Sequence, residues 1–201
     1  MTKILQINSS LFAEQGVSST LADQFVQGWL EREPDSQLQK RDLSAQPVPH
    51  LDSDRLSALM TPAEQRSPAQ QAMVDYADEL INEVQQADVL VLGLPMYNFS
   101  VPSTVKAWFD HIARAGVTFR YTDNGPEGLL HGKKAYVFTT RGGRHRNRPE
   151  DNQVPLVATF LAFLGITDVE FIYAEGLNMG DEHKRQGLAA ASNCIETLLA
   201  A

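Results

Sequence analysis

The feature that most constrains the fold is a short apolar run in the middle of the chain, "DVLVLGL" at residues 88–94. The run is far shorter than the roughly 20 apolar residues that a membrane-spanning helix needs. It also lacks the alternation of polar and apolar residues that marks a half-exposed strand. A strand that is apolar throughout is covered on both of its faces, as in a parallel sheet. We therefore predict that this run is the central strand of such a sheet.

Four other segments have strand character, and helical patterns lie between them. The predicted strands are residues 3–8, 38–43, 88–94, 134–140 and 169–174. The clearest helix covers residues 70–86, where apolar residues recur three and four positions apart. Four further helices are predicted. One begins near Ser18–Thr20, and one has Pro102 in its first turn. One covers residues 153–163, and the last includes Leu188–Leu198.

This alternation predicts an α/β fold with a parallel sheet between two layers of helices. Five such units favour a flavodoxin-like three-layer sandwich with strand order 2-1-3-4-5, as a single domain over residues 1–201. Two segments are additional to these five units. Residues 45–68 are broken by prolines and are predicted to cross the surface, and residues 116–133 combine aromatic residues with turn-forming ones.

Composition and charge exclude several classes of function. The net charge of -8 gives no basic footprint for nucleic acid. No segment is apolar and long enough to span a membrane, and the first residues do not resemble a secretory signal, so we expect a cytoplasmic protein. A single cysteine, Cys194, excludes an internal disulfide, and the five histidines lack paired ligand spacing, so no metal site is expected.

The predicted topology places a site at the carboxyl ends of the strands, where strand order reverses. Three loops meet there: "NSSLFAEQGVSST", "PMYNFSVPS" and "TRGGRHRNRP". The first carries serines at a helix N-terminus, which is typical of a phosphate site. The third has adjacent glycines that let the backbone approach a ligand. Its basic residues either attract an anion or form a solvated loop.

The motifs for larger nucleotides are missing from these loops. Neither "GxxxxGK[ST]" nor "GxGxxG" occurs, which argues against a nucleoside triphosphate and against a tightly held dinucleotide. A phosphate pocket beside a flat slot flanked by aromatics and glycines fits a mononucleotide with a planar head. Flavin mononucleotide (FMN) is the obvious case.

Three long blocks carry a resemblance to a known family: "PMYNFSVPSTVKAWFD", "ARAGVTFRYTDNGPEGLLHGKKAYVFTTRGG" and "FLAFLGITDVEFIYAEG". Over essentially its full length the chain resembles the FMN-dependent NADH azoreductases, which also reduce quinones. The resemblance implies a homodimer with one non-covalent FMN per subunit and active sites at the dimer interface. Our hypothesis for the mechanism is a ping-pong hydride transfer with NADH or NADPH as reductant, in which FMN carries the chemistry and no side chain is catalytic.

The resemblance also assigns residues to these roles. It implies phosphate binding by Ser10, Gly16, Val17 and Ser18, and flavin-ring contacts from Met96, Tyr97, Asn98 and Phe99 with Thr140, Arg141, Gly142 and Gly143 on the pyrimidine side. It implies a substrate pocket walled by aromatic residues and completed by a phenylalanine of the partner subunit, positions that Tyr121 and Phe163 occupy, although Phe163 is alternatively a core residue of its apolar helix. Family members often have Ser-Gln-Ser at positions 16–18, so here we expect backbone N–H groups, Ser10, Ser18, or Ser19 and Thr20 to carry more of the phosphate binding.

Two other classes of protein remain open on the sequence. An FMN-holding electron carrier without a small-molecule substrate is compatible with the acidic charge. A hydrolase with Ser9 or Ser10 as nucleophile has little support, since no "GxSxG" motif is present. A proton donor for the reduced product is either His145 or bulk water.

Overall fold

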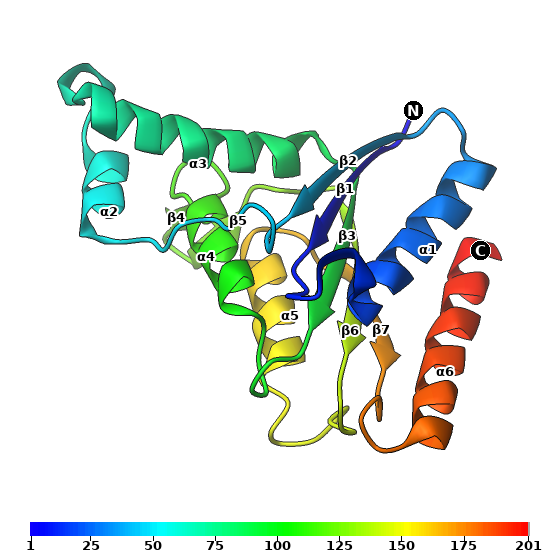
Figure 1. Cartoon of the computed structure of the whole chain (residues 1–201). Helices are drawn as coiled ribbons and strands as arrows, with labels where there is room; N and C mark the ends of the chain where they lie inside the picture. The colour runs from blue at the N-terminus through cyan, green and yellow to red at the C-terminus, as the bar shows by residue number, and fades with distance from the viewer. Residues whose placement is uncertain (201) are drawn as a thin grey trace.

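The computed structural model describes residues 1–200 and contains a five-stranded parallel sheet in the order β2-β1-β3-β6-β7 (Figure 1). Counting only these strands, this is the predicted order 2-1-3-4-5, so the fold class is confirmed. The strands are β1 Lys3–Asn8, β2 Gln37–Asp42, β3 Val89–Pro95, β6 Lys134–Thr140 and β7 Asp168–Ala174.

Helices cover both faces of the sheet. On one face α1 (Val17–Arg32) and α6 (Asp181–Ala200) pack against the strands, and on the other lie α3 (Pro68–Gln86), α4 (Ser103–Ile112) and α5 (Gln153–Phe163) (Figure 1). Every residue of β3 is buried, as predicted from its apolar run. No helix among residues 1–200 is long and apolar enough to cross a membrane.

Two helices begin elsewhere than predicted. The N-cap of α1 is Gly16, so Ser18 and Ser19 lie buried in the first turn instead of capping it. The N-cap of α4 is Pro102, whose extended backbone places it just before the helix. In contrast α3 begins with a complete capping box between Ser67 and Gln70, which explains a sharp start next to a long surface segment.

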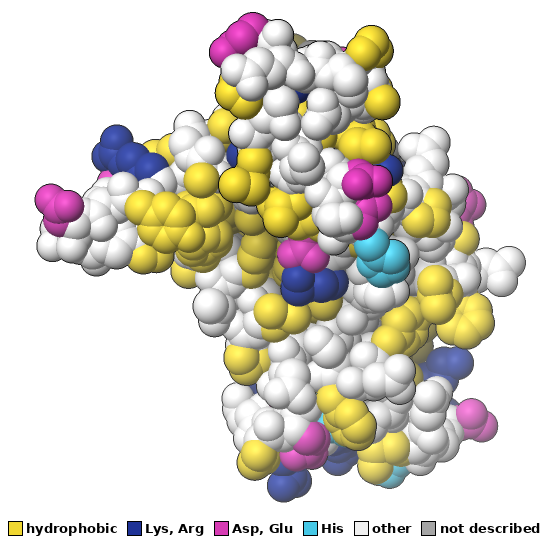
Figure 2. All heavy atoms as spheres, turned by 90° about the vertical axis from the view of Figure 1, so that its left-hand side faces the viewer, with side chains coloured by type: hydrophobic (Ala, Val, Ile, Leu, Met, Phe, Trp, Pro, Cys, Tyr) yellow, Lys and Arg dark blue, Asp and Glu magenta, His cyan; other side chains and the backbone are white. Residues whose placement is uncertain are grey.

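The two extra segments contain elements that the periodicity did not reveal. Residues 45–68 include α2 (Ser53–Met60) and the short 3₁₀ helix η2 (Ala63–Gln65), with Asp52 capping α2. Residues 116–133 form a hairpin of β4 (Phe119–Thr122) and β5 (Gly125–Gly128). The hairpin meets the end of α5 so closely that a Cβ on Gly128 would lie 2.1 Å from the nitrogen of Gly165. The side of the molecule toward α2 shows several clusters of hydrophobic side chains (Figure 2).

A buried histidine lies in the layer formed by α3 and α4. His111 is 2% exposed, and its Nδ1 lies 2.9 Å from the carbonyl oxygen of Ala107. Its Nε2 is buried without a hydrogen-bond partner among the described residues. Burial lowers the pKa of the imidazole below its ordinary value. The fold therefore keeps His111 neutral.

Acid should destabilise the protein through His111. The unfolded chain takes up the proton first, near pH 6.5, so the free energy of unfolding falls from about that pH down to the lower pKa of the folded state. His111→Gln removes this contribution. Urea unfolding at about pH 7.5 and about pH 5 should show a smaller acid loss for the variant than for the wild type. Equal losses in both proteins would contradict this role.

Candidate functional site

Two hollows open at the carboxyl ends of the strands, and Met96 and Tyr97 line both. The larger, of about 800 Å³, is lined mainly by the segment after β3, with Leu11 and Leu156. The smaller, of about 280 Å³, has walls from the segments after β1, β6 and β7, including Ser10, Val17 and Gly142. The three predicted loops therefore do meet in one place. They are joined by the segment after β7, which sequence analysis did not include.

Tyr97 connects the first two of these loops. Its phenol oxygen accepts a hydrogen bond from the backbone N–H of Leu11 at 3.1 Å. The adjacent Met96 N–H donates to the carbonyl of Thr140 at 2.8 Å, continuing the pairing of β3 with β6. Tyr97 thus stands between the hollows at a fixed position.

The residues after Tyr97 form a tight turn with an uncommon backbone. Tyr97 and Ser100 exchange backbone hydrogen bonds of 3.0 and 3.1 Å, and the two residues between them are both left-handed, Asn98 at φ 49° and Phe99 at φ 67°. Asparagine tolerates this conformation, but for phenylalanine it costs about 1–3 kcal/mol. Such strain persists only where surrounding contacts hold it.

Two contacts from the segment after β6 hold Phe99. The carbonyl of Phe99 accepts a hydrogen bond from the backbone N–H of Asn152 at 3.1 Å. The ring of His145 meets the Phe99 ring edge-on, with centroids 5.6 Å apart. Phe99 nevertheless remains 50% exposed, so its ring is available to a ligand or a second protein surface.

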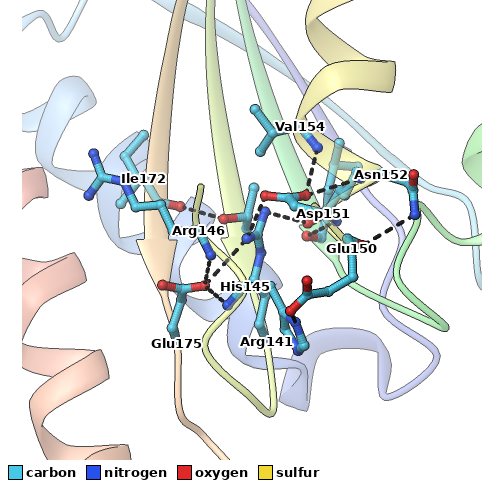
Figure 3. Close-up of polar contacts among 12 residues, drawn as sticks. Arg141, His145, Arg146, Glu150, Asp151, Asn152, Val154, Ile172 and Glu175 are labelled. Carbon is cyan, nitrogen blue, oxygen red and sulfur yellow. Dashed lines mark hydrogen bonds and ion pairs between the residues drawn. The ribbon is translucent and has the colours of Figure 1, made fainter. Parts of the chain in front are cut away.

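A buried arginine organises this segment (Figure 3). The side chain of Arg141 is 0% exposed, and its Nη1 lies 2.8 Å from Oδ2 of Asp151 and 3.3 Å from Oε1 of Glu175. Its Nη2 donates to Oε1 of Gln153 at 3.4 Å. We call these four residues the Arg141 cluster.

Both carboxylates of the Arg141 cluster also accept backbone N–H groups. Glu175 accepts those of His145 and Arg146 at 2.7 and 2.8 Å. Asp151 accepts those of Gln153 and Val154, both at 3.2 Å, at the start of α5. The two residues that hold Phe99, His145 and Asn152, are thus either bonded to a cluster carboxylate or adjacent to one. The cluster fixes both ends of the segment from which Phe99 is supported (Figure 3).

Of the glycine pair after β6, Gly142 lines the smaller hollow. The carbonyls of Gly142 and Gly143 accept the N–H groups of Asn178 and Gly176 at 3.0 and 2.9 Å. Their own N–H groups have no backbone partner among the described residues. A Cβ on Gly142 would lie 2.7 Å from the side-chain nitrogen of Asn178, so glycine is required for this close approach.

The start of α1 provides donors for an anion. No side chain caps this helix, so the N–H groups of its first turn lack a side-chain partner. The hydroxyls of Ser18 and Ser19 are buried and have no hydrogen-bond partner among residues 1–200. A phosphate group would satisfy these groups, which fits the expected role of the first loop.

We call the start of α1, together with Ser10, Ser18 and Ser19, the anion cradle. Gly16 and Thr20 also lie at this start. A Cβ on Gly16 would lie 2.1 Å from Oγ of Ser10, so a side chain at position 16 would collide with Ser10 as it is placed here. The hydroxyl of Thr20 is exposed and donates to the carbonyl of Gly16 at 3.2 Å. The Thr20 hydroxyl proton is thus already donated within the helix start, and Ser10, Ser18 and Ser19 remain as hydroxyl donors for an anion.

Three of the arginines after β6 contact other groups of the protein. Arg141 is buried in its cluster, Arg144 lies 3.0 Å from a ring nitrogen of His183, and Arg146 stacks on Tyr173 at 4.4 Å from the ring centroid. The side chain of Arg141 is thus occupied by carboxylates, and the ligand contact predicted for this residue is left to its backbone. Nothing in the sequence between Arg141 and Arg148 indicated that Glu175, 34 positions away, would bind this arginine.

The predicted substrate residues lie together, but outside both hollows. Tyr121 on β4 is 75% exposed, and Phe163 ends α5. Both rings contact Phe119, with centroid distances of 5.5 and 4.4 Å. Neither residue lines a hollow of its own chain.

The alternative chemistries lose support. Ser9 is buried and donates its hydroxyl to the carbonyl of Gly93 at 2.8 Å, and no histidine partner accompanies it or Ser10 within residues 1–200. Over the same residues no group of three or more histidine, cysteine, aspartate or glutamate side chains is arranged to hold a metal.

The fold and the site together define a flavodoxin-like protein, and residues 2–199 match the model of the flavodoxin-like fold family. The FMN-dependent NADH:quinone oxidoreductase of Cellvibrio japonicus (strain Ueda107) is 52% identical over 201 residues, covering 100% of both chains. This chain therefore belongs to the family of FMN-dependent NADH:quinone oxidoreductases, and its recognition from sequence is confirmed.

Solved structures agree with this membership. An azoreductase from Bacillus anthracis str. Sterne superposes with a TM-score of 0.91 at 28% identity, covering 99% of each chain. An FMN-dependent NADH-azoreductase from Bacillus anthracis str. Ames Ancestor, solved in complex with FMN, has a TM-score of 0.88 at 25% identity and covers 99% of this chain and 100% of that one.

Replacing Arg141 should be severely destabilising. Arg141→Met leaves the carboxylates of Asp151 and Glu175 without their buried cation, for which a loss of about 3–5 kcal/mol is expected. Arg148→Met removes an exposed arginine of the same segment and should change stability by less than about 0.5 kcal/mol. Denaturant unfolding of both variants checks this. Similar small losses would show that the cluster contributes little.

Proposed function

We propose that this chain is an FMN-dependent oxidoreductase that uses NADH or NADPH to reduce quinones and azo compounds. One observation carries the proposal: the start of α1, which no side chain caps, contributes Val17 to a hollow that Ser10, Met96, Tyr97, Thr140 and Gly142 also line. This arrangement suits a phosphate at one end and a planar ring at the other. The names of the relatives at about half identity support the same assignment.

The residues present fit FMN. Ser10, Ser18 and the backbone of Gly16 and Val17 would hold the phosphate, with Ser19 as a further donor. Met96, Tyr97 and Phe99 would shape the slot for the ring, with Thr140 and the backbone of Arg141 at its pyrimidine side. When bound, FMN supplies the capacity to accept and donate hydride.

The protein's own contribution is positioning and electrostatics. The amide of Asn98 offers both a donor and an acceptor to a ring edge. The N–H groups of Gly142 and Gly143 are preorganised donors for negative charge that develops at the pyrimidine side. Because the Arg141 cluster fixes these loops in advance, little reorganisation is needed when the ring binds.

We infer a ping-pong mechanism in which both substrates use the larger hollow in turn. The chain has no "GxGxxG" motif for a separately held dinucleotide. The larger hollow beside Met96 and Tyr97 would receive the nicotinamide first and the quinone or azo compound afterwards. No titrating side chain is assigned to the proton transfer, and bulk water can supply the proton.

We further propose a homodimer with the active sites at its interface. Tyr121 and Phe163 lie outside the two hollows described above, and Tyr121 is 75% exposed. In a dimer these rings would wall the pocket of the second copy. Exposed Leu11, Phe12 and Phe99 at the site supply apolar surface for such an interface.

A direct test is anaerobic spectroscopy of the purified protein. It should be yellow, should bleach when NADH is added and should regain colour with a soluble quinone. Steady-state kinetics should give parallel double-reciprocal lines, as expected for ping-pong turnover. Protein that neither retains nor binds FMN would refute the proposal. Reduction only through a partner reductase would identify an electron carrier.

Substituting Asn98 separates its amide from its backbone conformation. Both Asn98→Ala and Asn98→Gly remove the amide, but glycine keeps the left-handed backbone without strain. If the amide contacts the flavin, both variants should bind FMN roughly tenfold more weakly or shift its reduction potential. Fluorescence titration and potentiometry measure these changes. A Gly variant that matches the wild type would show that only the backbone of this turn matters.

A further inference from the structure

The free positive charge available to the smaller hollow comes from α6, outside the three loops that were predicted to form the site. Of the arginines after β6, Arg141, Arg144 and Arg146 are engaged with carboxylates, a histidine and a tyrosine ring, and the exposed Arg148 does not line this hollow. The other cation that lines this hollow is Lys184, in the first turn of α6. Within residues 1–200 Lys184 forms no ion pair, whereas its neighbour Arg185 pairs with Glu182.

The hollow also places Lys184 near the anion cradle. Its walls include Ser10 and Val17 as well as Lys184 and Asn178, so α6 and the start of α1 face the same space. The two helices pack side by side on one face of the sheet (Figure 1). The long, flexible lysine side chain is exposed and can reach across an open hollow.

The cradle has a shortage of charge that such a lysine would offset. Its donors are neutral hydroxyls and backbone N–H groups, and Gly16 and Val17 bring no polar side chain. A phosphate monoester carries close to two negative charges at neutral pH. The helix dipole of α1 supplies only about half a positive charge.

We propose that Lys184 binds the phosphate of FMN and is a specificity residue for the phosphorylated flavin over riboflavin. This inference rests on the proposed use of FMN. It adds a contact from α6 to a site otherwise built from the segments after β1, β3, β6 and β7. The contact is a charge-assisted hydrogen bond from the ammonium group to a phosphate oxygen.

The experiment compares FMN and riboflavin binding to the full chain by flavin fluorescence titration. Lys184→Gln should weaken FMN binding roughly threefold to tenfold, a range reduced for solvent exposure, and leave riboflavin binding unchanged. Lys184→Arg should retain most of the affinity. The difference between wild type and Lys184→Gln should shrink at high salt, since an exposed contact is screened.

Arg185→Gln is the matched control, because it removes one positive charge from the same turn but from a residue that does not line the hollow. It should leave both affinities unchanged. Equal weakening of FMN and riboflavin by Lys184→Gln, or no weakening of either, would overturn the proposal. A higher KM for NADH with unchanged FMN affinity would also overturn it and assign Lys184 to the nicotinamide. Wild-type protein that binds no FMN would refute the proposed function itself.

Discussion

The structure of the site depends on one buried cation. Burying Arg141 is costly unless its charge is compensated, and Asp151 and Glu175 provide that compensation from opposite sides. Each carboxylate also binds backbone N–H groups, so the requirement to neutralise one charge determines the path of the chain from His145 to the start of α5. The need to compensate the charge of Arg141 therefore fixes the conformation of this loop.

The strained turn at Asn98–Phe99 is a consequence of this geometry. An isolated Tyr97–Ser100 segment has no reason to keep a phenylalanine in the left-handed region. The contacts from Asn152 and His145 make that conformation the one that fits. The turn is therefore set before any ligand arrives, and a planar ring meets a surface that is already formed.

Much of the fold could be predicted because it follows from local patterns. The apolar run of β3 and the alternation of strands and helices define the parallel sheet and its order. The elements α2, β4 and β5 escaped prediction because they are short and bury few side chains. The role of Arg141 could not be predicted, since its partner Glu175 is distant in sequence and neighbouring arginines suggested a solvated loop. Lys184 was missed because only the loops after the first, third and fourth strands were considered, although every parallel strand ends at the same edge.

The close approach of Ser10 to Gly16 has a consequence for how such chains vary. The space that a side chain at position 16 would need is filled by the hydroxymethyl group of Ser10. The two positions therefore compete for a single volume at the start of α1. A larger residue at position 16 is compatible only with a different placement of Ser10. At the phosphate end of the site, residues 10 and 16 are therefore sterically coupled, and a change at one position affects the other.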